Sequence, residues 1–241
     1  MLSEKAMSKI LVAVATYNEI ENLPELTKQI FASLPESDLL VIDDGSPDGT
    51  GKWAAEEATN NPRLFLLERG AKKGLGTAVL EGFRFAIEGE YDYLINLDAD
   101  FSHPPAILPK LLAAAENEGI DVVIGSRYVK GGKIVGWPLS RKLMSRSINA
   151  WARFFLRLST KDNSGSLRCY RVSTLRKLDF ARIRSHGYSF FEEILFRLKQ
   201  CGAAFREIPI TFTDRVRGSS KINRKEALKA VGLLFLIGRE R

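Results

Sequence analysis

The sequence predicts an α/β protein with a mostly parallel sheet and helices on both faces. Two observations lead to this prediction: short apolar, β-rich runs recur along the first half of the chain, and segments with helical periodicity separate them. Parallel strands covered on both faces have this continuous apolar character. With 241 residues, 45% of them hydrophobic, the chain is long enough for one large α/β domain with a full core.

Strands and helices are predicted in strict alternation between residues 10 and 125. The predicted strands are Ile10–Ala15, Leu39–Asp43, Arg63–Leu67, Tyr93–Leu97 and Asp121–Gly125. The predicted helices are Ile20–Leu34, Gly51–Thr59, Gly76–Glu88 and Ala106–Glu118. In such a sheet the ligand lies at the carboxyl ends of the strands, so a site is expected there.

Charge and residue usage narrow the function classes. A net charge of +7 and a pI of about 9.4 predict an anionic partner: nucleic acid, anionic lipid or a phosphorylated substrate. Cys169 and Cys201 are the only cysteines, which indicates a reducing compartment without a disulfide framework. With His103 and His186 as the only histidines, a histidine zinc site or a Ser-His-Asp triad is not expected.

No segment of the sequence predicts a membrane span. The N-terminal MLSEKAMSK has no apolar h-region, so no signal peptide is expected. The apolar run AVGLLFLIG, residues 230–238, has nine residues, whereas a span needs about 20. The protein is expected to be soluble or to lie on a membrane surface.

Acidic and polar side chains follow three of the predicted strands. They are Tyr17, Asn18 and Glu19 after the first strand, Asp43 and Asp44 at the end of the second, and Asp98 and Asp100 after the fourth. Because the carboxyl ends of parallel strands meet at one edge of a sheet, these side chains are expected to converge.

The stretch LINLDADFSHPP, residues 94–105, places two carboxylates one residue apart. Two carboxylates aimed at one point repel each other unless a cation lies between them, so Asp98 and Asp100 predict a site for Mg²⁺ or Mn²⁺. Ser102 is a candidate third ligand, directly or through water. The alternative is a helix start with Ser102 as N-cap before Pro104 and Pro105, and the two interpretations are compatible.

Two glycine-containing stretches differ in what they predict. DDGSPDGTGK, residues 43–52, is a turn before a helix that Asp48 or Thr50 caps, whereas Asp44 is free to accept hydrogen bonds from a nucleobase or ribose. GLGTA, residues 74–78, lacks the G-x-G-x-x-G spacing, and the chain has no Walker A lysine motif. NAD binding and P-loop NTP hydrolysis are therefore not predicted.

The segment from residue 122 to 161 contains nine basic residues and no Asp or Glu. Apolar residues recur in it at helical spacing: Met144, Ile148, Trp151, Phe155 and Leu158. This predicts a basic amphipathic helix, lying either on an anionic membrane surface or against the sheet with solvated arginines. Arg127, after the fifth strand, is expected on the rim that carries the carboxylates.

The later stretch DRVRGSSK, residues 214–221, carries Arg215 and Lys221 on either side of Gly-Ser-Ser. Two cations on such a loop are suited to closing over phosphates and stabilising a leaving group. The alternative is a solvated basic loop.

Taken together, the motifs resemble one family. They are ATYNE at 15–19, DDGSPDGT at 43–50, DADFSHPP at 98–105, GSRY at 125–128, DNSGSLRCY at 162–170 and DRVRGSSK at 214–221. In this order they are similar to polyprenol-phosphate mannosyltransferases (dolichol-phosphate mannose synthases) of glycosyltransferase family 2, which have a GT-A fold. The resemblance implies a catalytic domain at 1–215, with a basic loop and helix at 216–241 as part of the same domain.

The resemblance also implies roles for individual residues. The guanosine-binding positions would be Ala15, Tyr17, Glu19, Ile42 and Asp44. The metal ligands would be Asp98, Asp100 and Ser102, with Ala99 alongside in the nucleotide-sugar site. Donor or acceptor phosphates would be contacted by Arg127, Arg215 and Lys221. The phosphate of the lipid acceptor would be bound by Arg127, Arg141 and Ser145. Asp100, Arg127, Arg215 and Lys221 would be the catalytic residues.

The resemblance further implies partners and a location. The substrates would be GDP-mannose and a polyprenyl or dolichyl phosphate. The chain resembles the short subtype without transmembrane helices, which is peripheral on the cytoplasmic face of a membrane or depends on a small membrane-anchoring subunit. Three positions depart from the usual motifs: Ala15 replaces Pro, Leu167 replaces Phe and Ser102 replaces Gln.

Residues and resemblance predict the same mechanism. An acceptor phosphate is already anionic at neutral pH, so direct displacement with inversion needs no general base and gives a β-linked product. Three alternatives remain: a UDP-glucose donor, a sugar or glycan acceptor, and a non-enzymatic nucleic-acid binder. The acid-free basic segment argues against a neutral acceptor, and a nucleic-acid binder would leave the Asp98/Asp100 pair unexplained, so no nucleic-acid partner is expected.

Overall fold

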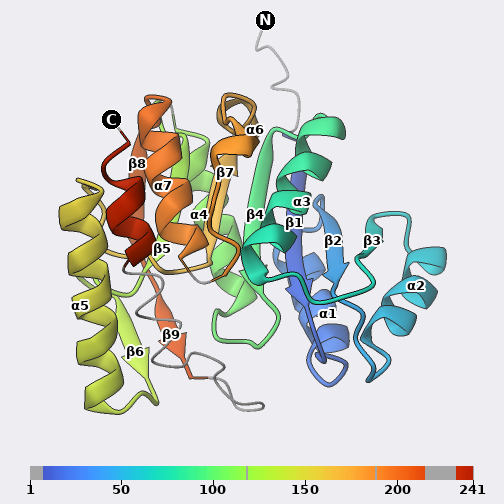
Figure 1. Cartoon of the computed structure of the whole chain (residues 1–241). Helices are drawn as coiled ribbons and strands as arrows, with labels where there is room; N and C mark the ends of the chain where they lie inside the picture. The colour runs from blue at the N-terminus through green and yellow to red at the C-terminus, as the bar shows by residue number, and fades with distance from the viewer. Residues whose placement is uncertain (1–7, 118, 188, 215–231, 241) are drawn as a thin grey trace, which may run out of the picture.

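The computed structural model of the chain describes residues 8–117, 119–187, 189–214 and 232–240. Within these ranges seven strands form a mixed sheet in the order β3-β2-β1-β4-β7-β5-β8, and β6 pairs with β9 separately. Figure 1 shows the sheet running through the middle of the molecule between layers of helices. The predicted α/β class, with a mostly parallel sheet covered on both faces, is confirmed.

The bounds of the strands and helices are as follows. The strands are β1 (Ile10–Thr16), β2 (Asp38–Asp43), β3 (Leu64–Glu68), β4 (Tyr93–Asp98), β5 (Val122–Ser126), β6 (Lys133–Val135), β7 (Arg168–Arg171), β8 (Phe205–Pro209) and β9 (Thr211–Thr213). The helices are α1 (Leu23–Ser33), α2 (Thr50–Asn60), α3 (Leu75–Glu88), η1 (Pro105–Ile107), α4 (Leu108–Ala115), α5 (Leu139–Phe155), α6 (Val172–Leu175), η2 (Phe180–Arg182) and α7 (Phe190–Gln200). Residues 232–237 form a further helical segment.

The alternation of β1 side chains explains why both faces of the sheet are covered. Leu11 and Ala13 belong to the apolar cluster that includes α3 and α7, whereas Val12 and Val14 belong to the cluster that includes α1 and α4. All four are at most 2% exposed. Because successive side chains of a strand point to opposite faces, an apolar run without polar residues requires a helical layer on each side.

Strand β7 was not predicted from the sequence, and it changes the sheet where the site lies. It is antiparallel to β4 and β5 and separates them, with Ile95 opposite Cys169 and Val123 opposite Cys169 on the other side. Because β7 runs in the opposite direction, the loop that precedes it lies at the carboxyl ends of β4 and β5. Residues 160–166 therefore join the edge where Asp98 and Arg127 lie.

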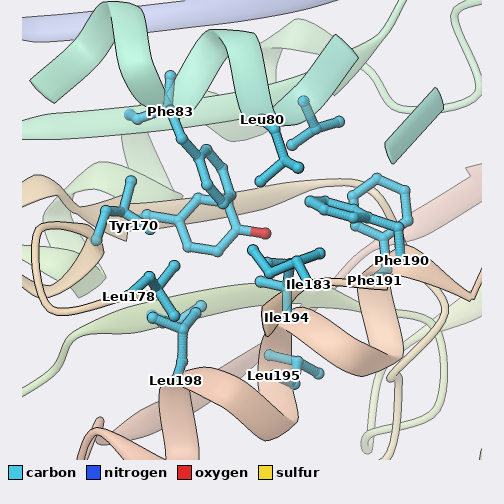
Figure 2. Packing of buried hydrophobic residues seen from close by; sticks show 14 of the residues in the cluster. Leu80, Phe83, Tyr170, Leu178, Ile183, Phe190, Phe191, Ile194, Leu195 and Leu198 are labelled. Atoms are coloured by element: carbon cyan, nitrogen blue, oxygen red, sulfur yellow. The ribbon is translucent and has the colours of Figure 1, made fainter. Parts of the chain in front are cut away.

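The GLGTA glycines serve close packing at the start of α3. A Cβ on Gly76 would lie 2.7 Å from the Phe190 ring, and one on Gly74, whose φ is +101°, would meet the His186 carbonyl oxygen. Figure 2 shows Phe190 and Phe191 in the cluster that also holds Phe83 and Tyr170, whose rings meet edge to face at 5.0 Å. These glycines thus allow α7 to approach α3.

Helix α5 is the predicted amphipathic helix, except that Leu158 lies beyond its end. The helix ends at Phe155, Met144 and Trp151 are exposed, and the residues that it buries are Asn149 and Ala152. The helix therefore packs through small and polar side chains and leaves much of its apolar surface uncovered. In the described residues, no helix is long and apolar enough to cross a bilayer.

Candidate active site at the carboxyl edge of the sheet

Asp43 organises the turn after β2. Its carboxylate is 2% exposed and accepts hydrogen bonds from the Thr16 hydroxyl, the Gly45 and Ser46 N–H groups and the Ser46 hydroxyl. The Ser46 hydroxyl oxygen also accepts from the Asn18 N–H, at 2.9 Å. A buried carboxylate is stable when donors satisfy it in this way. Asp43 therefore fixes the loops after β1 and β2 together.

The loop after β1 has a second attachment, at the start of α2. Asp48 Oδ1 accepts from the Thr50 N–H and hydroxyl, while its Oδ2 accepts from the Ile20 N–H. The Thr50 hydroxyl oxygen accepts from the Glu19 N–H at 3.0 Å. The N-cap position of α2 is Gly49, which has no side-chain cap, so neither Asp48 nor Thr50 is the predicted N-cap residue. Asp48 instead holds the first residue of the helix from one position earlier, and with Thr50 it positions the backbone at Ile20 and Glu19.

Asp44 lies beside Arg69 in a nearly buried ion pair, with Arg69 Nη1 3.1 Å from Asp44 Oδ1 but not oriented as a hydrogen bond. Burial raises the pKa of Asp44, and Arg69 opposes that rise. The sequence analysis did not single out Arg69. An acidic group held by one cation at a strand end retains a second oxygen for other donors, so the predicted nucleotide contact of Asp44 is compatible with the pair.

The other predicted guanosine positions fall into two groups. Ala15, Tyr17 and Glu19 are half-buried at the rim, and the Lys72 ammonium lies 4.4 Å from the centre of the Tyr17 ring. Ile42 is 1% exposed and packs in the core. The predicted contact between Ile42 and the nucleotide stays a prediction. The buried side chain of Ile42 does not support it. Ala99, 4% exposed, is likewise a core residue.

Asp98 and Asp100 are held by separate hydrogen bonds at the end of β4. Asp98 Oδ2 accepts a hydrogen bond from the Ser166 hydroxyl at 2.5 Å. The Asn96 side-chain amide donates a hydrogen bond to the Ser166 carbonyl oxygen. Asp100 Oδ1 accepts from the Ser102 N–H at 3.1 Å. Phe101, which lies between Asp100 and Ser102 in the sequence, has φ +57°. This conformation is strained for a bulky residue and common at functional turns.

Ser102 behaves differently from a helix cap. Its hydroxyl lies 3.2 Å from His103 Nδ1 and is almost fully buried, while η1 begins after Pro104 without a side-chain cap. The predicted N-cap alternative is therefore wrong. His103 is 2% exposed, and burial lowers its pKa to about 4, so its ring is neutral at neutral pH. Metal ligation by the Ser102 hydroxyl stays a prediction.

Arg127 forms the most completely buried ion pair of the edge. Its Nε and Nη2 donate to the two oxygens of Asp162 at 2.8 and 2.6 Å, and its backbone N–H donates to the same carboxylate at 2.8 Å. Asp162 is 0% exposed, and Arg127 is 8% exposed. Arg127 also lines a hollow beside α5, so its predicted phosphate contact stays a prediction beside this structural role.

Arg141 and Ser145 lie one turn apart on α5. The Ser145 hydroxyl oxygen accepts from the Tyr128 hydroxyl at 2.7 Å, which places Ser145 next to the residue that follows Arg127. Arg141 stacks on Trp137 and donates to Asp214 at 3.1 Å, as does the Trp137 ring N–H. Arg215 and Lys221, the remaining predicted phosphate ligands, lie outside the described residues.

The donor set at the end of β4 fits a hard divalent cation. Two carboxylates one residue apart, both half-buried, offer the oxygen ligands that Mg²⁺ and Mn²⁺ prefer. Within the described ranges, no group of three or more acidic, His or Cys side chains is arranged to hold a metal. A cation bound here would therefore draw further ligands from water or from substrate phosphates, as Mg²⁺ does at phosphate-transfer sites.

Sequence reasoning missed three residues that position the site. Asp162 holds Arg127, Ser166 holds Asp98, and Arg69 pairs with Asp44. One signal was available for Asp162: it is the first acid after the 40 acid-free residues that contain Arg127. No comparable signal marks Ser166 or Arg69, because each meets its partner only through the folding of distant segments.

Comparison with known proteins agrees with this geometry. The family model for glycosyl transferase family 2 matches residues 11–179, a span that includes Asp98, Asp100, Arg127 and the loop before β7. The chain belongs to glycosyltransferase family 2. It is therefore an enzyme that transfers a sugar.

Named relatives narrow the subgroup of family 2. Undecaprenyl-phosphate mannosyltransferase of Micrococcus luteus is 45% identical over 215 residues, covering 89% of this chain and 88% of the relative. Polyprenol monophosphomannose synthase of Mycolicibacterium smegmatis is 40% identical over 235 residues, covering 96% and 88%. The resemblance recognised in the motifs is confirmed.

Solved structures confirm the glycosyltransferase fold. The chain is similar to glucosyl-3-phosphoglycerate synthase of Mycobacterium tuberculosis, with a TM-score of 0.68 at 20% identity, over 97% of this chain and 79% of that one. That protein was solved with Mn²⁺, UDP and glucosyl-3-phosphoglycerate. At this identity the likeness is one of fold, and it agrees with the GT-A architecture predicted from the motifs.

Proposed function

We propose that this family 2 enzyme transfers mannose from GDP-mannose to a polyprenyl monophosphate, giving a β-linked mannosyl phosphoryl polyprenol and GDP. The observation that carries the proposal is the 45% identity, over 89% of the chain, to an undecaprenyl-phosphate mannosyltransferase. The site is compatible with it, because a carboxylate pair at the end of β4 lies in the same sheet edge as Arg127, with Arg141 and Ser145 on α5 beside it.

The donor would occupy the edge formed by the loops after β1, β2 and β4. Tyr17 and Glu19 lie on a loop that Asp43 and Asp48 hold rigidly, and Asp44 lies beside them. Asp98 and Asp100 would hold Mg²⁺ or Mn²⁺, which when bound would neutralise charge on the donor diphosphate and favour its departure. A protein of similar fold was solved with Mn²⁺ and UDP, which supports this part of the proposal.

The acceptor phosphate would lie toward α5, near Arg127, Arg141 and Ser145. The acceptor phosphate is already anionic at neutral pH, so no proton has to be removed from it before attack. The His103 ring, which lies beside Asp98, stays neutral because burial lowers its pKa. The work of the protein is then to orient two phosphorylated substrates and to stabilise charge on the leaving group. Direct displacement inverts the anomeric centre of an α-linked donor.

A membrane surface is part of this proposal. The acceptor is a lipid, and α5 exposes Leu139, Leu143, Met144 and Phe154 beside exposed basic residues, a composition suited to the interface of an anionic membrane. The enzyme would be peripheral on the cytoplasmic face, with or without a small anchoring subunit.

The test is a transfer assay with labelled GDP-mannose or labelled UDP-glucose, a polyprenyl phosphate in detergent, and Mg²⁺, Mn²⁺ or EDTA. We expect label in the organic phase only from GDP-mannose and only with metal. Transfer from UDP-glucose would overturn the donor and keep the mechanism. Full activity in EDTA would overturn the metal assignment.

A further inference from the structure

A hollow of about 1100 Å³, which Arg127 lines but Asp98 and Asp100 do not, lies between α5, the loop after β5 and the C-terminal residues 235–239. Figure 1 shows α5 at one side of the molecule with the C-terminal segment next to it. The charged residues that line the hollow are all cations: Arg127, Arg146, Arg153, Arg157, Lys161 and Arg239. This concentration of one sign of charge is what requires explanation.

The walls of the hollow are built by packing. Arg146, Asn149 and Arg153 lie three and four residues apart, so they share one side of α5. On the opposite wall the Phe235 ring lies 5.6 Å from that of Phe155, and Gly238 approaches so closely that a Cβ there would lie 2.8 Å from the Phe155 carbonyl oxygen. The C-terminal segment is thus fitted against α5.

Five of the six cations have no carboxylate partner among the described residues. Arg127 pairs with Asp162, whereas Arg146, Arg153, Arg157, Lys161 and Arg239 form no ion pair in that part of the chain. Some arginines elsewhere in the described residues do have carboxylate partners, as with Arg141 and Asp214 or Arg197 and Glu193. Like charges crowded without counter-charges raise the potential of the hollow and attract anions.

The rim of the hollow is apolar as well as basic. Two aromatic residues that line it are exposed, Phe154 at 76% and Phe235 at 42%. A small inorganic anion would use the cations and leave these side chains in water. A ligand that carries both an anionic head and hydrocarbon chains would use both features.

The geometry points to a binding site for the phosphate headgroup of an anionic membrane phospholipid, with its acyl chains against Phe154 and Phe235. This site deepens the peripheral membrane association of the proposed function and rests on it. Of the predicted acceptor positions, Arg141 and Ser145 do not line the hollow, and Arg127, which does, is engaged by Asp162. The lipid bound there would be one of the bilayer and not the sugar acceptor.

The test compares two variants with the same change in net charge. Arg146→Gln, Arg153→Gln and Lys161→Gln together remove three cations from the hollow, and Lys28→Gln, Lys52→Gln and Lys110→Gln remove three exposed lysines from other helices. Co-sedimentation with phosphatidylcholine vesicles, with and without phosphatidylglycerol, measures partitioning. At about a factor of five for each cation, the hollow variant should lose roughly 100-fold on phosphatidylglycerol vesicles, and the control variant no more than a few-fold.

Four outcomes overturn the inference: equal loss in both variants, no loss in the hollow variant, equal binding to vesicles without phosphatidylglycerol, or tighter binding to duplex DNA than to phosphatidylglycerol. A second assay separates it from the proposed function, using a short, water-soluble polyprenyl phosphate without vesicles. The hollow variant should match the wild type there. Selective loss in that assay would assign the hollow to the acceptor and overturn the inference, whereas no transfer by the wild type would count against the proposed function alone.

Discussion

Replacing Asp162 with Asn should destabilise the protein strongly, because it would leave the Arg127 guanidinium buried without a counter-charge. In the wild type, three N–H groups of Arg127 donate to the Asp162 carboxylate within 2.8 Å, and the pair is almost entirely removed from water. Breaking a buried pair by removing one partner costs about 3–5 kcal/mol. That is a large fraction of the roughly 5–15 kcal/mol by which domains are stable.

The assay is urea denaturation followed by circular dichroism, with two comparisons. The double variant Asp162→Leu with Arg127→Met leaves neither charge buried, so it should recover much of the loss. Arg141→Gln breaks the pair with Asp214, whose side chains are 24% and 30% exposed, and should cost no more than about 1 kcal/mol. A cost below about 1 kcal/mol for Asp162→Asn, or a double variant no more stable than the single one, would refute the reasoning.

Four further outcomes are expected. Asp100→Ala should remove most sugar transfer, and Ser166→Ala, which frees Asp98 Oδ2, should lower it about 10-fold; both should keep wild-type melting curves. Glu192 is buried and its pKa is raised to about 7, above the unfolded 4.5, so folding stability should fall as pH rises through that window. Glu192→Gln should flatten this dependence and at pH 8 restore up to about 3 kcal/mol, measured by urea denaturation. Gly76→Ala should cost about 1–3 kcal/mol by forcing a methyl group into the Phe190 ring, read from the urea midpoint.

The alternating half of the fold was predictable because its signal is local. The apolar runs that became β1, β2, β4 and β5 are buried on both faces and need helices on both sides, and that requirement is visible in the sequence. Strand β7 was not predictable in this way. It has four residues, too few for a periodicity, and its pairing with β4 and β5 joins residues 44 to 78 positions apart.

The site shows the same division. Asp98 and Asp100 were predictable because two carboxylates directly after a buried strand have few structural explanations. The partners of these residues were not, since the Asp98–Ser166 contact spans 68 positions and the Asp44–Arg69 pair depends on where β3 ends. What covers the apolar face of α5 was left open for another reason: helical periodicity identifies an amphipathic helix but not which of its residues face the protein.

The reversed direction of β7 connects the two halves of the predicted active site. The chain enters β7 from the carboxyl edge, so residues 162–166 contact three elements there. Ser166 bonds Asp98 of β4, Asp162 bonds Arg127 just after β5, and Asn163 bonds Asn149 of α5. Asn149 Oδ1 accepts from the Asn163 and Ser164 N–H groups, and the Ser164 hydroxyl oxygen accepts from Arg127. One buried loop therefore sets the position of the carboxylate pair and that of α5. A parallel strand in its place would have put this loop at the opposite edge and left the two sides of the site without a common support.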